Sequence, residues 1–180
     1  MTFEAIAVGA GLCVREAEPA DEAAVLRVFD QAGDYFTAVN GDRALPGDFQ
    51  SLFYAAPEGV APETKEILVV ERDGEIVGVV DVVPGHPDQW TAAAGLFLLA
   101  PAHRRQGVGS AVLRALVERG RERGLRTVTA SIPAGWEPGA AFLTATGFRL
   151  HDPAGPRDGT GNRVVHRGEG PVVTATLAIG

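Results

Sequence analysis

Cysteine, lysine and long apolar runs are scarce in this sequence of 180 residues. Its single cysteine, Cys13, excludes an intrachain disulfide and a cysteine-rich metal site, so we expect no metal centre. No apolar run approaches the roughly 20 residues that cross a membrane, and the first residues lack the basic stretch of a secretory leader. We therefore expect a cytoplasmic protein with no membrane partner.

Positive charge is also in short supply. The formal net charge is −7 and the isoelectric point is near 5.1, whereas nucleic-acid binding depends on a basic face. We expect no nucleic-acid partner, and an acidic surface favours small cationic amines instead. With 46% hydrophobic residues the chain can bury one core. The expected organisation is a single domain at residues 12–180, after an extension at residues 1–11 whose order the sequence leaves open.

The most informative stretch is residues 95–114. A strand-length apolar run stops before Pro101, a basic loop with the sequence Arg-Arg-Gln-Gly-Val-Gly occupies residues 104–109, and a helical pattern follows at once. Gly107 and Gly109 leave backbone N–H groups uncovered at the positive end of a helix, and the two arginines add charge. This pattern predicts a site for a phosphorylated ligand.

The spacing of the glycines narrows the choice of ligand. A phosphate-binding NTPase loop requires a lysine that the stretch lacks, and a dinucleotide fingerprint requires a third glycine where Val112 stands. A glycine-rich turn with a solvated basic edge is the purely structural alternative. The order strand, Pro101, Arg-x-x-Gly-x-Gly and amphipathic helix instead resembles the acetyl-CoA-binding motif of the GNAT N-acetyltransferase superfamily.

Periodicity along the rest of the chain predicts the element order βααβββαβαββ. An Asp73-Gly74 pair between two β-branched runs predicts a hairpin, Gly124 is expected to end the long helix, and residues 151–170 are expected to form a long turn or a mobile loop. This order is similar to that of a GNAT domain. The implied fold is α/β, with a mixed central sheet of about six to seven strands flanked by about four helices.

The resemblance implies positions for the cofactor and the acceptor. Backbone groups of Leu98 and Leu99 would bond the pantetheine arm of acetyl-CoA, and Phe142 would lie near the far end of the cofactor. The pyrophosphate would be enclosed by Arg104, Arg105, Gln106, Gly107, Val108, Gly109 and Ser110. Tyr35 and Tyr54 fall where the early helices of the family form the acceptor pocket.

The acid and base of the family are not matched. Trp136 replaces an asparagine at the start of the last helix, Leu143 replaces the tyrosine that protonates the thiolate, and residues 92–96 carry no acid. Asp81 is a candidate base if its side chain is buried beside the cofactor, and an outward-facing aspartate is the alternative. His86, whose imidazole can exchange protons near neutral pH, and Ser131, as a proton donor, are the other catalytic candidates.

These patterns lead to a first hypothesis of an N-acetyltransferase that moves an acetyl group from acetyl-CoA to a small amine in a direct ternary complex. The alternative is a catalytically silent CoA-binding protein of the same fold that acts as a sensor or interaction module. An enzyme that acetylates protein N-termini is a third possibility. An exposed sheet edge near the C-terminus would allow a homodimer.

Overall fold

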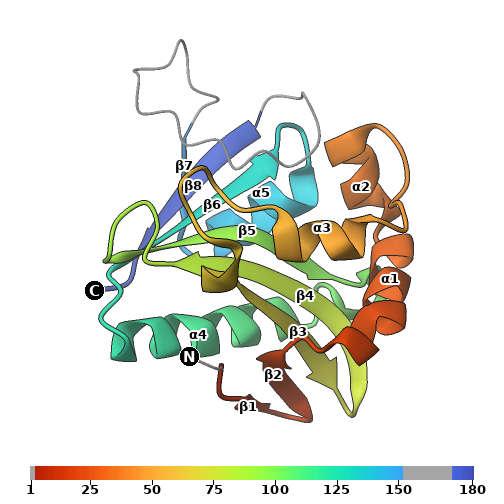
Figure 1. Ribbon diagram of the computed structural model, residues 1–180, viewed down its shortest axis with the longest axis horizontal. Coiled ribbons are helices and arrows are strands. Elements are labelled where there is room, and N and C mark those ends of the chain that lie inside the picture. Colours follow the sequence, from red (N-terminus) through yellow and green to blue (C-terminus); the bar gives the residue numbers. More distant parts are fainter. Residues whose placement is uncertain (1–2, 152–171) are drawn as a thin grey trace.

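The computed structural model describes residues 3–151 and 172–180, which form an eight-stranded sheet of order β1-β2-β3-β4-β5-β6-β8-β7 (Figure 1). The strands are β1 (Ile6–Gly9), β2 (Leu12–Glu16), β3 (Glu66–Arg72), β4 (Glu75–Pro84), β5 (Thr91–Leu99), β6 (Thr127–Pro133), β7 (Arg149–His151) and β8 (Val172–Ala178). The α-helices are α1 (Glu22–Gln31), α2 (Gly33–Asn40), α3 (Asp48–Tyr54), α4 (Val108–Glu122) and α5 (Glu137–Ala145). Short 3-10 helices occupy Pro19–Asp21, Pro62–Thr64 and Pro101–His103.

The expected α/β fold with a mixed sheet is confirmed, but the expected numbers of elements are too low. The described residues hold eight strands and five α-helices. The additional strand, β1, lies within the N-terminal segment and pairs with β2 through a turn in which Gly9, Ala10 and Gly11 have positive φ. The additional helix arises because Ala32, with a ψ of 38°, separates α1 from α2. The long turn expected at residues 151–170 lies outside the described residues, apart from His151 in β7.

Two local turn predictions are confirmed. Asp73 and Gly74, with φ of 52° and 84°, connect β3 to β4, as a two-residue hairpin turn requires. Gly124 follows the last turn of α4 with a φ of 82°, and its amide donates to the carbonyl of Arg121. Both turns need a left-handed backbone, which glycine adopts without steric cost. The glycines at positions 74 and 124 therefore indicate these turns in the sequence.

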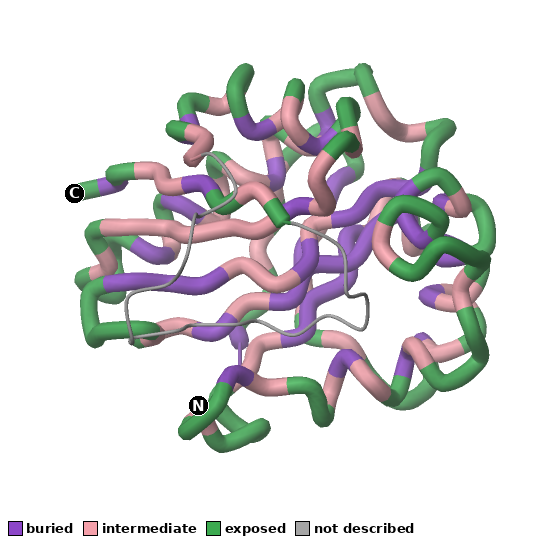
Figure 2. Tube along the Cα trace, turned by 90° about the horizontal axis from the view of Figure 1, so that it is seen from above, coloured by how far each residue is buried: buried purple, intermediate pink, exposed green. Residues whose placement is uncertain are grey.

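Helices cover both faces of the sheet (Figure 1). Because side chains alternate along a strand, Ile67 and Val69 of β3 pack with α1, α2 and α3, whereas Leu68 and Val70 pack with α4. A third cluster joins α5 to β6 and β8. Figure 2 shows the buried residues concentrated along the central strands, between the helical layers.

The feature that matters most for function is the separation of β5 and β6. All neighbouring strands are antiparallel except this pair, whose parallel register ends at Ala94 and Ala130. Beyond that point residues 96–99 stay paired with β4, and residues 131–133 stay paired with β8. A bulge at Gly95, where the register with β4 shifts, marks the point of divergence. The sheet therefore opens at the carboxyl ends of its two parallel strands, where α/β sheets bind ligands.

The edges of the sheet are β1 and β7. The edge near the C-terminus, β7, is three residues long, and a homodimer through it stays a prediction. Within residues 3–151 and 172–180, no helix has the length and apolar character needed to cross a bilayer.

The first helix is anchored to the sheet by Arg15 of β2. Its guanidinium donates to both carboxylate oxygens of Asp21, at 2.7 and 2.9 Å, and its Nε donates to Glu71 of β3 at 2.9 Å. Asp21 directly precedes α1 and also accepts a hydrogen bond from the Glu18 amide at 2.8 Å. The hydrogen bond from Arg15 lowers the pKa of Asp21, even though burial opposes the shift. This network fixes the start of the helix that carries Phe29 into the core.

We expect Asp21→Asn to lower the free energy of unfolding at pH 7 by about 1–3 kcal/mol, the range for a hydrogen bond between charged groups. Because the folded-state pKa lies below the usual value of 3.8, the pair stabilises the fold above that value and loses this effect as pH falls through the lowered pKa. Urea unfolding at pH 7 and at acid pH should therefore show a difference between the two proteins that shrinks in acid. Asp42→Asn, at an exposed carboxylate that accepts from the Arg43 amide, is the control and should change little.

Candidate active site

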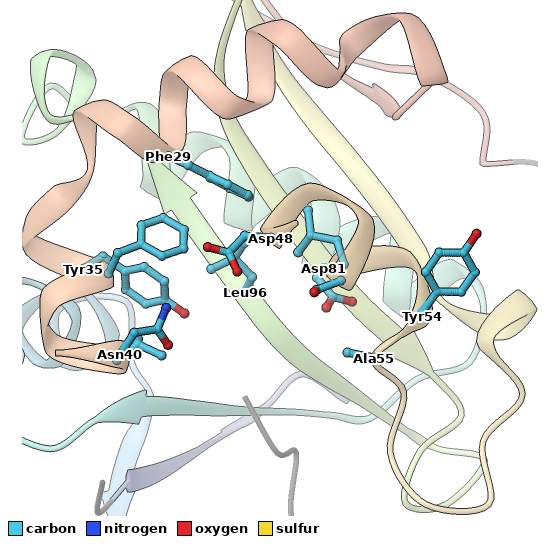
Figure 3. Close-up of a pocket in the computed structure, with 12 residues that line it drawn as sticks. Phe29, Tyr35, Asn40, Asp48, Tyr54, Ala55, Asp81 and Leu96 are labelled. Carbon is cyan, nitrogen blue, oxygen red and sulfur yellow. The ribbon is translucent and has the colours of Figure 1, made fainter. Parts of the chain in front are cut away.

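A cavity of about 310 Å³ lies where α1, α2 and α3 face β4 and β5 (Figure 3). We call it the acceptor cavity, and it is lined by Phe29, Tyr35, Phe36, Val39, Asn40, Asp48, Ser51, Leu52, Tyr54, Ala55, Asp81 and Leu96. Both tyrosines named from the sequence line it. Tyr35 is 8% exposed, with its hydroxyl turned into the cavity, whereas Tyr54 is 77% exposed and points away from it. Of the two tyrosines, Tyr35 is therefore the one that lies in the interior of the cavity.

Asp81 is buried, so the outward-facing alternative is wrong. Its Oδ2 lies 3.0 Å from Nζ of Lys65, and both side chains are 3% exposed. The ammonium of Lys65 also donates to the carbonyls of Leu52 and Ala55, at the end of α3. Three acceptors therefore use the three donors of this ammonium, and the pair ties α3 to β4. A buried charge is tolerated when it is paired in this way.

Sequence reasoning missed Lys65. Its one signal is its uniqueness, since it is the only lysine among sixteen basic residues and directly precedes the buried strand β3. The β3–β4 hairpin places Asp81 opposite Ile67 and therefore close to Lys65. The exact register depends on a bulge at Val70 and Glu71, which the sequence does not reveal.

The hydroxyl of Tyr35 has no hydrogen-bond partner among the described residues. Burial, reinforced by the negative charges of Asp81 and Asp48, raises the pKa of Tyr35 well above its usual value. The phenol therefore stays neutral and offers one donor to the cavity. Asp48, at the start of α3, is half-buried and accepts a hydrogen bond from the Leu45 amide at 2.6 Å.

The glycine loop joins the open end of β5 to α4. The amides of Val108, Gly109 and Ser110 in the first turn of α4 have no partner among the described residues, as expected at a helix N-terminus. Gly107 has a φ of 78° and open space where a side chain would stand. These free amides and the open space fit the anionic pyrophosphate expected there.

Phe142 of α5 lies at the same place. A Cβ on Gly109 would come within 3.0 Å of the Phe142 ring, so the first turn of α4 packs closely against α5. The Phe142 ring also stacks on Phe97 of β5, with centroids 5.2 Å apart and an interplanar angle of 29°. The structure thus brings together the glycine loop and Phe142, which the sequence assigned to one cofactor site.

Arg104, also assigned to the pyrophosphate, has well-defined partners of its own. Its Nε donates to the Leu99 carbonyl at 2.9 Å, and its two terminal nitrogens reach the Asp34 carboxylate of α2 at 2.6 and 3.2 Å. Trp136 adds its indole N–H to Asp34 at 3.3 Å, and the guanidinium lies 6.0 Å from its ring centroid. Burial alone would raise the pKa of Asp34, but hydrogen bonds and charge from Arg104 hold it below its usual value. This cluster links the cofactor loop to α2, and its carboxylate partner was not identified from the sequence.

The remaining predicted residues lie around these sites rather than in the acceptor cavity. Gln106 accepts from Arg72 and donates to the Ala102 carbonyl, and Arg105 is exposed with a φ of 62°. The side chains of Leu98 and Leu99 are buried in the two main core clusters, and their backbone belongs to the segment of β5 that has left β6.

Two of the three catalytic candidates do not line the acceptor cavity. His86 lies in the loop that leads into the start of β5, whereas the glycine loop follows the end of that strand. Ser131 is half-buried in β6, opposite Thr174 of β8, just beyond the last pairing with β5. Asp81 is the only one of the three that lines it. The catalytic roles of His86 and Ser131 stay predictions.

The free amides at the start of α4 fit a phosphorylated cofactor, and they lie where β5 and β6 separate. The acceptor cavity lies beside this opening and can hold a second reactant. Together these features indicate a transferase that uses a phosphorylated cofactor. Comparison with known proteins makes this class specific. Residues 27–148 match the model of the acetyltransferase (GNAT) family, and the chain belongs to this family. The family uses acetyl-CoA, so the resemblance inferred from the glycine loop is confirmed. The family to which the chain belongs is a family of acetyltransferases.

Individual relatives are more distant. Mycothiol acetyltransferase of Nocardia farcinica is 32% identical over 78 residues, which cover 37% of this chain and 25% of that protein. A Salmonella typhimurium acetyltransferase that modifies the N-terminal serine of a ribosomal protein has a TM-score of 0.73 at 17% identity, covering 98% of this chain and 100% of that one. The acetyltransferase yncA of the same organism, solved with acetyl-CoA, has a TM-score of 0.60 at 19% identity, covering 94% and 95%. The two structural similarities establish the fold.

We expect Gly107→Val to weaken CoA binding at least about tenfold, because a branched side chain would occupy the open space beside the free amides. Gly124→Val is the matched control, since Gly124 also has a positive φ and open space but lies at the other end of α4. Each variant should lose about 1–2 kcal/mol of stability or more through left-handed strain. Calorimetric titration with CoA separates them. Equal CoA affinity in the two variants would contradict a cofactor site at this loop.

Proposed function

We propose that this chain transfers an acetyl group from acetyl-CoA to the amine of a small acceptor that binds in the acceptor cavity, in a direct ternary complex. The observation that carries this proposal is the position of Leu96. It lines the acceptor cavity and belongs to the segment of β5 that has separated from β6, beside the glycine loop. One short segment of strand therefore borders both the cavity and the opening proposed for the cofactor. Holding two reactants next to each other supplies much of the rate of such a reaction.

The fit of the cofactor rests on the free amides of Val108, Gly109 and Ser110, the open space at Gly107 and the Phe142 ring. Acetyl-CoA, when bound, supplies the acetyl group as a thioester: the acceptor nitrogen forms an amide bond as the carbon–sulfur bond breaks, and CoA leaves as a thiol with the proton that the amine gives up. Residues 95–99 no longer pair with β6, so backbone amides of this segment that face away from β4 are suitable donors for a carbonyl oxygen on which negative charge develops.

Asp81 is the proposed proton acceptor for the amine. It lies opposite Leu96 on the neighbouring strand and lines the cavity, so an amine that approaches Leu96 meets its carboxylate. Lys65 positions this carboxylate through the buried ion pair. Tyr35, neutral and with a free hydroxyl, is placed to hydrogen-bond the acceptor.

The small volume of the cavity favours small acceptors, since about 310 Å³ is at the lower end for ligand pockets. The assay is release of CoA thiol from acetyl-CoA in the presence of a panel of small amines and a peptide with a free N-terminus. We expect small amines to stimulate release over the hydrolytic background. If CoA binds but no acceptor stimulates release, the chain is instead a CoA-binding module without turnover. Stimulation by the peptide alone would favour N-terminal acetylation.

A double-mutant cycle separates catalysis from stability at the buried pair. Asp81→Asn should lower kcat by about 10²–10⁴, the usual contribution of a general base. It should also lower the free energy of unfolding by about 3–5 kcal/mol, because Lys65 is left charged and buried without its partner. Adding Lys65→Met should restore most of that stability but not kcat. Thiol release and urea unfolding provide the two measurements. A double variant with the kcat of the unmodified protein would exclude Asp81 as the base.

A further inference from the structure

The acceptor cavity contains a carboxylate whose charge is not compensated. Asp21 pairs with Arg15, Asp34 with Arg104 and Asp81 with Lys65. Asp48, in contrast, forms no ion pair among the described residues, and it accepts a hydrogen bond from the neutral amide of Leu45. It is half-buried and lines the cavity, so water screens it less than a surface carboxylate.

No cation is available in the cavity to balance this charge. None of the residues that line it is a lysine, arginine or histidine. The nearest buried cation, Lys65, already has three acceptors in Asp81 and the carbonyls of Leu52 and Ala55. Counting Asp81, Lys65 and Asp48 together, the described charges in and around the cavity sum to one net negative charge at neutral pH.

Tyr35 provides a second, independent indication of a missing ligand group. The Tyr35 residue is nine-tenths buried, its hydroxyl is turned into the cavity, and no hydrogen bond of this hydroxyl is found among the described residues. The hydroxyl of a largely buried tyrosine usually has a hydrogen-bond partner, and this one is close enough to both carboxylates to be affected by their charge. Figure 3 shows Asp48 and Asp81 in the middle of the cavity and Tyr35 on its α2 side.

We propose that the acceptor carries a second cationic centre besides the nitrogen that is acetylated, and that Asp48 binds this centre. The inference rests on the proposed function and specifies the class of its substrate: a small diamine, or an amine that also bears a guanidinium. An acceptor with a carboxylate in that place, such as an amino acid, is disfavoured by like-charge repulsion with Asp48.

The need for a second charge follows from the chemistry. The nitrogen that attacks the thioester must be neutral, so a monoamine that has given its proton to Asp81 has no charge left for Asp48. A diamine keeps one ammonium protonated throughout the reaction. The two carboxylates lie on different elements, Asp48 on α3 and Asp81 on β4, so one can bind the retained ammonium while the other serves the reacting nitrogen. Asp48 then contributes to the orientation of the acceptor.

Four acceptors of one chain length test this proposal: putrescine, aminobutanol, butylamine and γ-aminobutyrate. They end in a second ammonium, a hydroxyl, a methyl group and a carboxylate respectively. We expect kcat/KM for putrescine to exceed that for aminobutanol at least about tenfold, the lower end for a hydrogen bond between charged groups. We expect γ-aminobutyrate to be the poorest acceptor. Equal kcat/KM for putrescine and aminobutanol would overturn the proposal.

Asp48→Asn assigns the preference to one side chain. The asparagine keeps an oxygen for the Leu45 amide, so the start of α3 is preserved while the charge is removed. The ratio of kcat/KM for putrescine to that for aminobutanol should fall to about one, mainly through putrescine. Asp42→Asn, which removes an exposed carboxylate outside the cavity, is the matched control and should leave the ratio unchanged. A ratio that survives Asp48→Asn would show that another group reads the charge.

A binding measurement keeps this test independent of turnover. Calorimetric titration of the CoA-saturated protein with putrescine and with aminobutanol should show the same preference and the same loss in Asp48→Asn. If no amine in the series stimulates thiol release, the proposed transferase activity fails, and the binding ratio alone decides whether the cavity selects a dication. Equal binding of the two compounds would then refute the inference.

Discussion

The candidate active site depends on the separation of the two parallel strands, β5 and β6. β5 and β6 are paired over Thr91–Ala94 and Thr127–Ala130, and each then follows its antiparallel neighbour on the other side. The bulge at Gly95 lets β5 turn away without breaking its pairing with β4, and the stacked rings of Phe97 and Phe142 lie at the resulting opening. Beyond Ala94 and Ala130, the backbone groups that would otherwise pair β5 with β6 face the opening between the two strands. The helix that crosses between these strands, α4, begins at that opening and adds its own free amides there.

The acceptor cavity holds two carboxylates in different electrostatic settings: Asp81 is paired with Lys65, whereas Asp48 forms no ion pair among the described residues. The Lys65–Asp81 pair is buried and also satisfies two carbonyls at the end of α3, so it both positions the candidate base and holds the helix that forms the wall of the cavity. Buried ion pairs seldom add net stability over well-packed hydrophobic residues. The placement of Asp81 in a cavity therefore favours a chemical role for the pair. Asp48, which has no such partner, gives the same cavity its negative character.

Side-chain contacts connect the glycine loop to α2, which forms one side of the acceptor cavity. Arg104 follows β5 in the cofactor loop, Asp34 begins α2, and Trp136 precedes α5, and these three side chains contact one another. Tyr35, next to Asp34, packs its ring against Trp136 with centroids 5.0 Å apart. Trp136 thus links the glycine loop to α2 through its contacts with Arg104, Asp34 and Tyr35. A Cβ on Gly139 would lie 2.3 Å from the Trp136 ring, so this packing also restricts the first turn of α5.

The sequence by itself determined the elements and the cofactor loop. Alternation along β3 and β4, the Asp73-Gly74 turn and the glycines around α4 act through neighbouring residues, and such local signals are legible along a chain. β1 was missed because it has only four residues and none of them is buried, so its position depends on pairing with β2. The partners of Asp81, Arg104 and Tyr35 were likewise decided by the tertiary structure. Asp34 and Arg104 are distant in sequence and meet only when α2 folds over the sheet. Lys65 and Asp81 meet through the register of the β3–β4 hairpin, which a bulge at Val70 and Glu71 shifts. Charge pairing and burial act through space, and composition alone does not reveal which carboxylate is left without a partner.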